Sequence, residues 1–179
     1  MKKNAQVWIE TVLYTLIGLS LIAIVLAFVT PKITEAKDRA IIEQTISSLN
    51  QFDDRINTVL QAPGNIRSLE FTMKRGDFYI NSSGDELLFI LDDLKKPFSE
   101  PGVEIPFGRI KVYSENNQKT SSVYLKIDYG GKINITYQGE DNEIEDKFNS
   151  APIPYKFFIE SKQIQNGLEV VDIKEVSGR

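Results

Sequence analysis

The amino-terminal part of the chain is a long apolar stretch without charge. No charged residue lies between Glu10 and Lys32, and the run Thr11–Val29 is built from aliphatic and aromatic residues with a few hydroxyls. A helix needs about 20 such residues to cross the hydrocarbon core of a bilayer. The apolar region of a removed secretory signal spans only about 7–15 residues, and no small-x-small cleavage site follows here. The pattern therefore predicts a retained membrane helix.

A second helical pattern follows, with apolar residues on one side only. The apolar positions recur at steps of three and four residues between Ile33 and Gln61, which is the period of an amphipathic helix. They are Ile42, Ile46, Leu49, Phe52, Ile56, Val59 and Leu60. Pro63-Gly64 ends the pattern. Pro31 either kinks one continuous helix or opens a new one at its first turn. This stripe packs on its own domain, on neighbouring subunits, or on both along different lengths.

From Ala62 onward the pattern changes to short alternating runs that predict β-strands. Leu69–Met73 and Phe78–Ile80 flank Lys74–Asp77 as a hairpin, and Val123–Tyr129 and Lys132–Tyr137 flank Gly130-Gly131 as another. Further strands are expected at Glu86–Leu91, Gly108–Tyr113, Tyr155–Glu160 and Leu168–Ile173. The predicted fold is α+β: a long amino-terminal helix, apolar and then amphipathic, packed on a carboxy-terminal antiparallel β-sheet domain.

Composition narrows the chemistry. The 179 residues include no cysteine and no histidine, which removes disulfides, thiol nucleophiles, imidazole ligands and the Ser-His-Asp triad. The net charge is -4, so no basic surface for nucleic acid is expected. No phosphate loop or dinucleotide fingerprint occurs, and we expect neither an enzyme nor a cofactor.

Glu10 is the unusual residue of the apolar segment. A carboxylate costs up to about 3 kcal/mol at the bilayer centre and less near the interface. Glu10 either lies at headgroup level, or it has a partner charge that arises only after processing or assembly.

The first ten residues, Met1–Glu10, resemble the class III leader of archaeal type IV pilin-like proteins. The resemblance lies in a short basic leader, a small residue, then Gln, a spaced Glu and an apolar helix, and it covers roughly the first 60 residues. It implies that a prepilin peptidase cuts between Ala5 and Gln6, which makes Glu10 the fifth residue of the mature chain. The ammonium of Gln6 and the carboxylate of Glu10 would then pair and set the register between subunits. Trp8 and Tyr14 depart from the residues frequent in archaeal pilins.

The resemblance also implies an organisation and a location. Residues 1–5 are the leader, 6–30 the transmembrane and filament-core helix, 31–61 its amphipathic continuation and 62–179 the extracytoplasmic β-rich domain. The basic residues on the two sides of the span favour neither orientation; the resemblance places the leader in the cytoplasm and the β domain outside. The implied partners are other copies of the chain through their amino-terminal helices, the prepilin peptidase and the assembly machinery, with the membrane occupied before assembly.

The β region holds three weaker motifs. Asn81-Ser-Ser83 and Asn134-Ile-Thr136 are N-glycosylation sequons, and archaeal surface filaments are often glycosylated at such sites. Arg75-Gly76-Asp77 is explained by turn chemistry rather than adhesion. The acidic run Glu140–Asp146 does not match the EF-hand spacing, so a solvated loop is expected and no metal.

Two other classes of function and one variant of the pilin stay open. A single-pass anchored binding module would explain the span and the β domain but would leave Ala5-Gln6 and Glu10 as coincidences. A minor pilin or pseudopilin would share every feature named here. An extracytoplasmic enzyme is least favoured, because histidine and catalytic motifs are missing.

Overall fold

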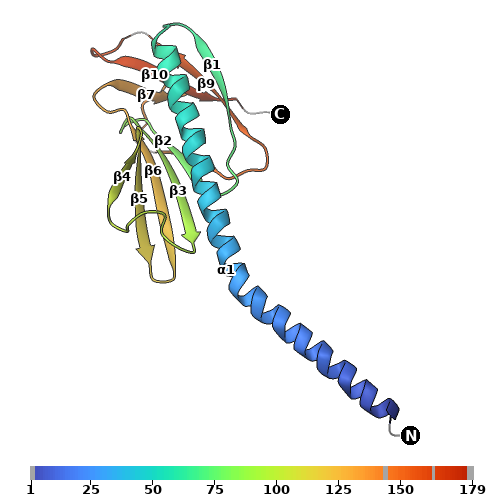
Figure 1. Cartoon of the computed structure of the whole chain (residues 1–179). Coiled ribbons are helices and arrows are strands. Elements are labelled where there is room, and N and C mark those ends of the chain that lie inside the picture. Colours follow the sequence, from blue (N-terminus) through green and yellow to red (C-terminus); the bar gives the residue numbers. More distant parts are fainter. Residues whose placement is uncertain (1–2, 143–144, 163, 177–179) are drawn as a thin grey trace. The chain divides into compact units, whose positions relative to one another are not determined.

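A computed structural model describes residues 3–142, 145–162 and 164–176, without the side chains of residues 3–6. It contains one long helix followed by β-strands (Figure 1). The helix is α1 (Lys3–Leu60). The strands are β1 (Ile66–Phe71), β2 (Asp77–Asn81), β3 (Glu86–Leu94), β4 (Glu104–Phe107), β5 (Ile110–Asn117), β6 (Thr120–Asp128), β7 (Ile133–Tyr137), β8 (Asp146–Asn149), β9 (Tyr155–Ser161) and β10 (Glu169–Glu175). The fold is α+β, as the sequence predicted.

The chain divides into two compact units, residues 1–37 and 38–179. The first unit is purely helical over its described residues. Pro31 lies inside α1 and does not end it. A proline within a helix removes one backbone hydrogen bond. Because α1 nevertheless continues through Pro31, one continuous helix is the correct alternative, and Pro31 does not open a new helix.

The second unit begins with the amphipathic part of α1, whose apolar stripe is buried. Ile42, Ile46, Leu49, Phe52, Ile56 and Val59 are all at most 4% exposed, and Leu60 packs against the same core. Polar residues on the opposite side of this segment, such as Glu43 and Asp54, are exposed. The 3.6-residue period thus places one apolar face against the β-strands, as the stripe predicted.

The strands form two sheets rather than the single sheet that the alternating pattern led us to expect. A four-stranded sheet has the order β1-β9-β10-β7, and a six-stranded sheet has the order β4-β5-β6-β3-β2-β8. Strand pairing is antiparallel except between β10 and β7, which are parallel. Both sheets contribute to one hydrophobic core with α1.

Phe52 lies where the helix and the two sheets meet. Its ring centroid is 5.8 Å from that of Phe71 in β1, 5.6 Å from Phe78 in β2 and 5.6 Å from Phe157 in β9. All four side chains are at most 1% exposed. Tilted and edge-to-face pairs at these distances add to the free energy gained from burial.

The first predicted hairpin is wrong. β1 pairs with β9 in one sheet, whereas β2 pairs with β3 and β8 in the other. The connection between them is fixed to the six-stranded sheet, because Arg75 Nη2 donates to the carbonyl oxygens of Asp92 and Asp93 in β3 at 2.6 and 2.7 Å. These long-range contacts replace the local pairing that strand alternation suggests.

The Gly130-Gly131 hairpin is also wrong. β6 lies in the six-stranded sheet and β7 in the four-stranded sheet, so these glycines connect two sheets. Tyr129 is buried at the turn, and its carbonyl accepts hydrogen bonds from the amides of Lys132 and Ile133. Gly131 has a φ of 73°, which favours glycine. The anchored Tyr129 side chain directs the chain into the other sheet.

Phe52→Ala should lower the free energy of unfolding of the second unit by about 3–5 kcal/mol, because it leaves a cavity between α1 and the strands β1, β2 and β9. Chemical denaturation of the full chain followed by circular dichroism measures this. The matched control is Ile164→Ala, at a side chain that is 67% exposed, and it should change stability by less than about 0.5 kcal/mol. Equal effects of the two substitutions would contradict the central place of Phe52.

Candidate functional site

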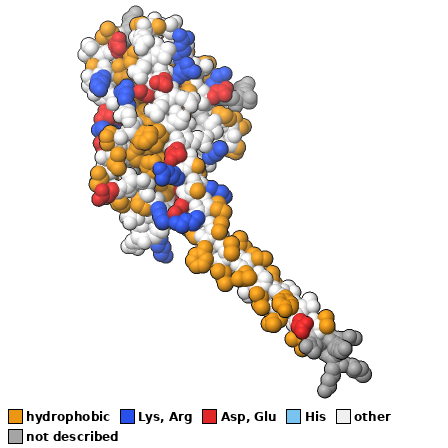
Figure 2. Space-filling model, in the orientation of Figure 1, with side chains coloured by type: hydrophobic (Ala, Val, Ile, Leu, Met, Phe, Trp, Pro, Cys, Tyr) orange, Lys and Arg blue, Asp and Glu red, His pale blue; other side chains and the backbone are white. Residues whose placement is uncertain are grey.

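The residues Val7–Val29 of α1, called here the apolar segment, have no cover within the described chain. The large hydrophobic side chains along it are exposed, including Trp8 at 70% and Phe28 at 74%. Figure 2 shows hydrophobic side chains along this part of the helix. Soluble monomers rarely expose an apolar surface of this extent. The described residues contain one helix that is long and apolar enough to cross a membrane, and this segment is its apolar part.

The threonine and serine residues of the apolar segment donate hydrogen bonds within the helix. Thr11 Oγ1 donates to the carbonyl of Val7 at 2.9 Å, Thr15 Oγ1 to that of Thr11 at 2.7 Å, and Ser20 Oγ to that of Leu16 at 2.8 Å. A polar group without a partner costs several kcal/mol in an apolar medium. These side chains therefore fit either lipid or tightly packed helices.

The predicted processing and assembly residues lie at the start of the same helix. Ala5 and Gln6 belong to α1, and their side chains, like Met1 and Lys2, lie outside the described residues. Glu10 is exposed on the helix, one turn after Gln6. The backbone of Ala5, Gln6 and Glu10 therefore lies on one helix. Cleavage between Ala5 and Gln6 stays a prediction.

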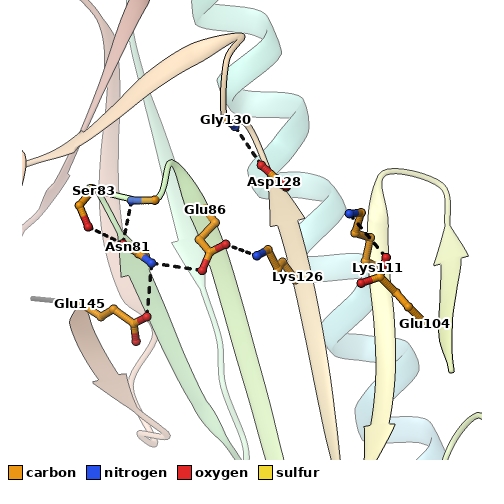
Figure 3. A network of polar contacts seen from close by, with 10 residues as sticks. Asn81, Ser83, Glu86, Glu104, Lys111, Lys126, Asp128, Gly130 and Glu145 are labelled. Carbon is orange, nitrogen blue, oxygen red and sulfur yellow. Dashed lines mark hydrogen bonds and ion pairs between the residues drawn. The ribbon is translucent and has the colours of Figure 1, made fainter. Parts of the chain in front are cut away.

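Asn81, the first sequon asparagine, is held in a polar network at the turn between β2 and β3 (Figure 3). Its Nδ2 donates to Glu86 Oε1 at 3.1 Å and to Glu145 Oε1 at 3.4 Å. Its Oδ1 accepts from Ser83 Oγ at 3.1 Å and from the Gly84 amide at 2.9 Å. An attached glycan would replace one Nδ2 hydrogen, so it would displace one of the two carboxylates.

The outer face of the six-stranded sheet continues this network. Glu86 also forms an ion pair with Lys126 in β6 (Figure 3). The carboxylate of Glu86 raises the pKa of the Lys126 ammonium above its ordinary value. Asn134, the second sequon asparagine, lies in the other sheet: it is in β7, opposite Val170 of β10, and is partly exposed. Glycosylation stays a prediction at both asparagines.

Arg75 and Asp77 are engaged within the second unit. Arg75 Nη1 lies 2.8 Å from Asp38 Oδ1, and Asp77 Oδ2 lies 2.9 Å from Lys147 Nζ. These contacts support the structural explanation of the Arg-Gly-Asp sequence. Gly76 has a φ of 90°, and a Cβ there would lie 2.5 Å from the Ile90 carbonyl oxygen, so only glycine fits this turn.

The acidic run Glu140–Asp146 includes Glu143, which lies outside the described residues. Among the described residues, no group of three or more carboxylates, histidines or cysteines is placed to hold a metal ion. Burial raises the pKa of the Asp146 carboxyl, and the charge of Glu140 acts in the same direction.

A buried ionic contact on α1 was not visible in the sequence. Asp53 Oδ1 accepts from the Tyr129 hydroxyl at 2.8 Å and lies 3.0 Å from Arg109 Nη1. Asn57 Nδ2 donates to Asp53 Oδ2 at 3.1 Å. The Arg109 guanidinium also lies 4.9 Å from the centroid of the Tyr129 ring. The only sign of this contact in the sequence was a carboxylate, Asp53, next to Phe52 of the apolar stripe.

Asp38 forms a second helix-to-sheet contact. Besides the ion pair with Arg75, its Oδ2 accepts from the Lys95 amide at 3.1 Å. Asp38 is 7% exposed and Asp53 is 6% exposed. Breaking such buried pairs is costly because a charge stays without compensation. The two carboxylates therefore fix the axial position of this part of α1 on the sheets.

A third buried carboxylate, Asp172 in β10, joins loops to the four-stranded sheet. Its side chain is fully buried and lies 2.8 Å from Lys162 Nζ, and its Oδ1 accepts from the Gly139 amide at 2.6 Å and from Thr136 Oγ1 at 2.9 Å. Burial alone would raise the pKa of Asp172, but these hydrogen bonds and the Lys162 charge outweigh it, so the pKa lies below its ordinary value.

No protein family, curated protein or solved structure matches this chain. Function is therefore inferred from the apolar segment, from Glu10 within it and from the surfaces of the second unit.

The free energy of unfolding should fall as the pH rises above about 10, partly because of Tyr129. Burial raises the pKa of its phenol, and the Asp53 carboxylate adds to this, so the folded state keeps a proton that the unfolded state releases. The contribution is fully present below pH 10 and is lost at up to about 1.4 kcal/mol per pH unit above it.

Tyr129→Phe removes this contribution, so its unfolding free energy should fall less steeply between about pH 10 and 12 than that of the wild type. At neutral pH the variant should be less stable by about 1–3 kcal/mol, because Asp53 loses a buried hydrogen bond. Denaturant titrations at several pH values give both quantities. Parallel pH curves for the two proteins would contradict this prediction, because they would show that the pKa of Tyr129 is the same in the folded and the unfolded state.

Proposed function

We propose that this chain is a structural subunit of a type IV pilus-like archaeal surface filament, which polymerises through its amino-terminal helix and serves adhesion or attachment. The observation that carries the proposal is the contrast along α1. Its amphipathic part is built into a hydrophobic core, whereas the apolar segment has exposed large hydrophobic side chains along its length. Such a helix needs lipid or other helices as its surroundings.

The two surroundings, lipid and other helices, correspond to two stages of filament assembly. A single apolar helix satisfies the hydrogen bonds of its backbone and can wait in a bilayer. Packing against copies of itself then replaces lipid contacts by helix contacts, so the proposal places the chain in the membrane before assembly and outside the cell afterwards. In this role it needs no catalytic activity and no cofactor.

Glu10 distinguishes this proposal from a simple membrane anchor. An anchor gains nothing from a carboxylate near one end of its apolar helix, because transfer into the membrane costs free energy. In a filament that carboxylate meets the amino terminus of Gln6, created by cleavage, in an apolar environment where attraction between charges is strong. The pair offsets the cost of Glu10 and sets the position of one helix along the next.

The mature protein should begin at Gln6. Amino-terminal sequencing and intact mass of the protein from its native membrane or filaments measure this directly. Ala5→Leu places a large side chain at the proposed cut, so it should leave the leader attached and abolish filaments. A native chain that still carries Met1 would overturn the proposed processing and favour the anchored binding module.

Glu10→Ala and Glu10→Gln should both be processed and inserted in the membrane but should lose assembly into filaments. The glutamine variant keeps the size of the side chain and removes the charge, so it isolates the proposed ion pair. The matched control is Thr15→Val, which changes a nearby exposed polar residue of the same helix and should leave assembly unchanged.

Electron microscopy of cells and sedimentation of sheared filaments measure the effect. Normal assembly by both Glu10 variants would refute the ion pair. Loss of assembly in Thr15→Val as well would show a general sensitivity of the helix instead.

A further inference from the structure

The two ends of the apolar segment carry different aromatic side chains. Trp8 lies at the amino-terminal end and is 70% exposed, whereas Phe28 lies at the other end and is 74% exposed. The helical rise of about 1.5 Å per residue puts about 30 Å between them along the axis of α1. The hydrocarbon core of a bilayer is also about 30 Å thick. In the membrane stage of the proposed function, Trp8 and Phe28 therefore lie at the two boundaries of the hydrocarbon.

Trp8 differs from Phe28 because its ring carries a polar group. The indole N–H is a hydrogen-bond donor. Lipid phosphates and water accept such a bond in the headgroup layer, whereas the hydrocarbon offers no acceptor. Tryptophan is enriched where a membrane meets water, because one end of its ring is apolar and the other is polar. Trp8 therefore has one favoured depth, which is the boundary itself, and Phe28 lacks the polar group that would impose one.

The helix directs the Trp8 side chain toward the headgroup layer. Every Cα–Cβ bond of an α-helix tilts toward the amino terminus, so a side chain covers the turn that precedes its own residue. The turn of α1 that precedes Trp8 contains Ala5 and Gln6. In the orientation of the proposed function, this turn is the cytoplasmic end of the helix. The indole therefore extends out of the hydrocarbon, on the side of the peptide bond at which cleavage is proposed.

The charges around Trp8 fit the same depth. Lys2 and Lys3 precede it in the sequence, and Glu10 is the one charged residue between Trp8 and Lys32. Basic residues beside a membrane helix are attracted to anionic headgroups. Glu10 lies only about 3 Å further along the axis than Trp8, and the same tilt directs its side chain back toward the headgroups. One depth of α1 therefore suits the leader, the indole and the carboxylate.

We propose that Trp8 is an interfacial anchor, which binds the cytoplasmic headgroup layer and holds α1 at a depth that keeps the Ala5–Gln6 peptide bond in water. This inference rests on the proposed function, because it concerns the chain in the membrane before cleavage. The peptide bond lies about 4 Å from Trp8 along the axis. A shift of α1 by one turn, about 5.4 Å, would carry it into the hydrocarbon. Hydrolysis of the bond consumes water, so Trp8 acts as a positioning residue for cleavage.

Trp8 is the only tryptophan of the chain, so tryptophan fluorescence reports this residue alone. The uncleaved full chain is reconstituted in bilayers of phosphatidylcholine and phosphatidylglycerol, whose acyl chains carry bromine at a series of depths. Bromine quenches fluorescence by contact. We expect the strongest quenching from bromines next to the headgroups and weak quenching from bromines near the bilayer centre. The reverse order would overturn the anchor, and so would quenching by aqueous iodide as strong as that of free tryptophan.

Two substitutions at the same position test whether this depth matters for cleavage. Trp8→Leu keeps the helix apolar and removes the polar group, so the rate of leader removal should fall about tenfold, because the peptide bond is misplaced. Trp8→Tyr keeps an aromatic ring with a polar tip and should restore nearly the wild-type rate. Pulse-chase labelling in cells, followed by the mass of precursor and mature chain, measures the rate.

A displaced tryptophan separates the depth of the helix from the presence of the side chain. Trp8→Leu with Val12→Trp moves the indole about one turn along α1, to a position whose side chain is also exposed. The new tryptophan should be quenched at the same depth as Trp8, because α1 shifts toward the cytoplasm, and cleavage should stay slow. The matched control is Phe28→Leu, which changes the other end of the apolar segment and should leave the depth and the cleavage rate unchanged.

The outcomes distinguish this inference from the proposed function. Cleavage of Trp8→Leu or of the displaced variant at the wild-type rate would overturn the positioning role and leave the proposed function intact. Normal cleavage of Trp8→Leu with loss of filaments would also overturn it, because the side chain would then act in the filament. A wild-type chain that keeps its leader while Trp8 lies at the boundary would overturn the proposed processing and support the anchor. A chain that does not insert in bilayers would overturn both.

Discussion

The second unit depends on one interaction, the burial of the amphipathic face of α1 between two sheets. Phe52 carries the centre of it, with aromatic neighbours from β1, β2 and β9. Neither sheet has another described helix to cover its apolar face. Because a sheet with one apolar face must bury it against another layer, the helix is the element that makes two sheets into one domain.

The same helix carries polar contacts that specify position rather than stability alone. Asp38 and Asp53 are almost fully buried, and their partners outside α1 come from the connections next to strands of the six-stranded sheet. An apolar stripe can slide by one turn with little change in burial, whereas a nearly buried carboxylate that loses its partner costs free energy. The two carboxylates therefore select one axial position of this part of α1.

The proposed function divides the tasks of the chain by physical environment. In the proposal, the apolar segment is the part of the chain that leaves water, and Glu10 within it would supply the specificity that apolar packing lacks. The second unit buries its apolar residues in its own core and carries the polar network around Asn81 on the outer face of the six-stranded sheet.

The sequence by itself determined the features that depend on local periodicity. The uncharged run predicted the apolar segment, the three- and four-residue steps predicted which face of α1 is buried, and alternation located most strands, because each pattern repeats within a few residues. Tertiary structure decided which strands are neighbours. Gly130-Gly131 has the local chemistry of a hairpin, yet burial of Tyr129 and its contact with Asp53 send the chain into the other sheet. The free energy of such distant contacts exceeds the preference of a two-residue turn, and no local pattern records it.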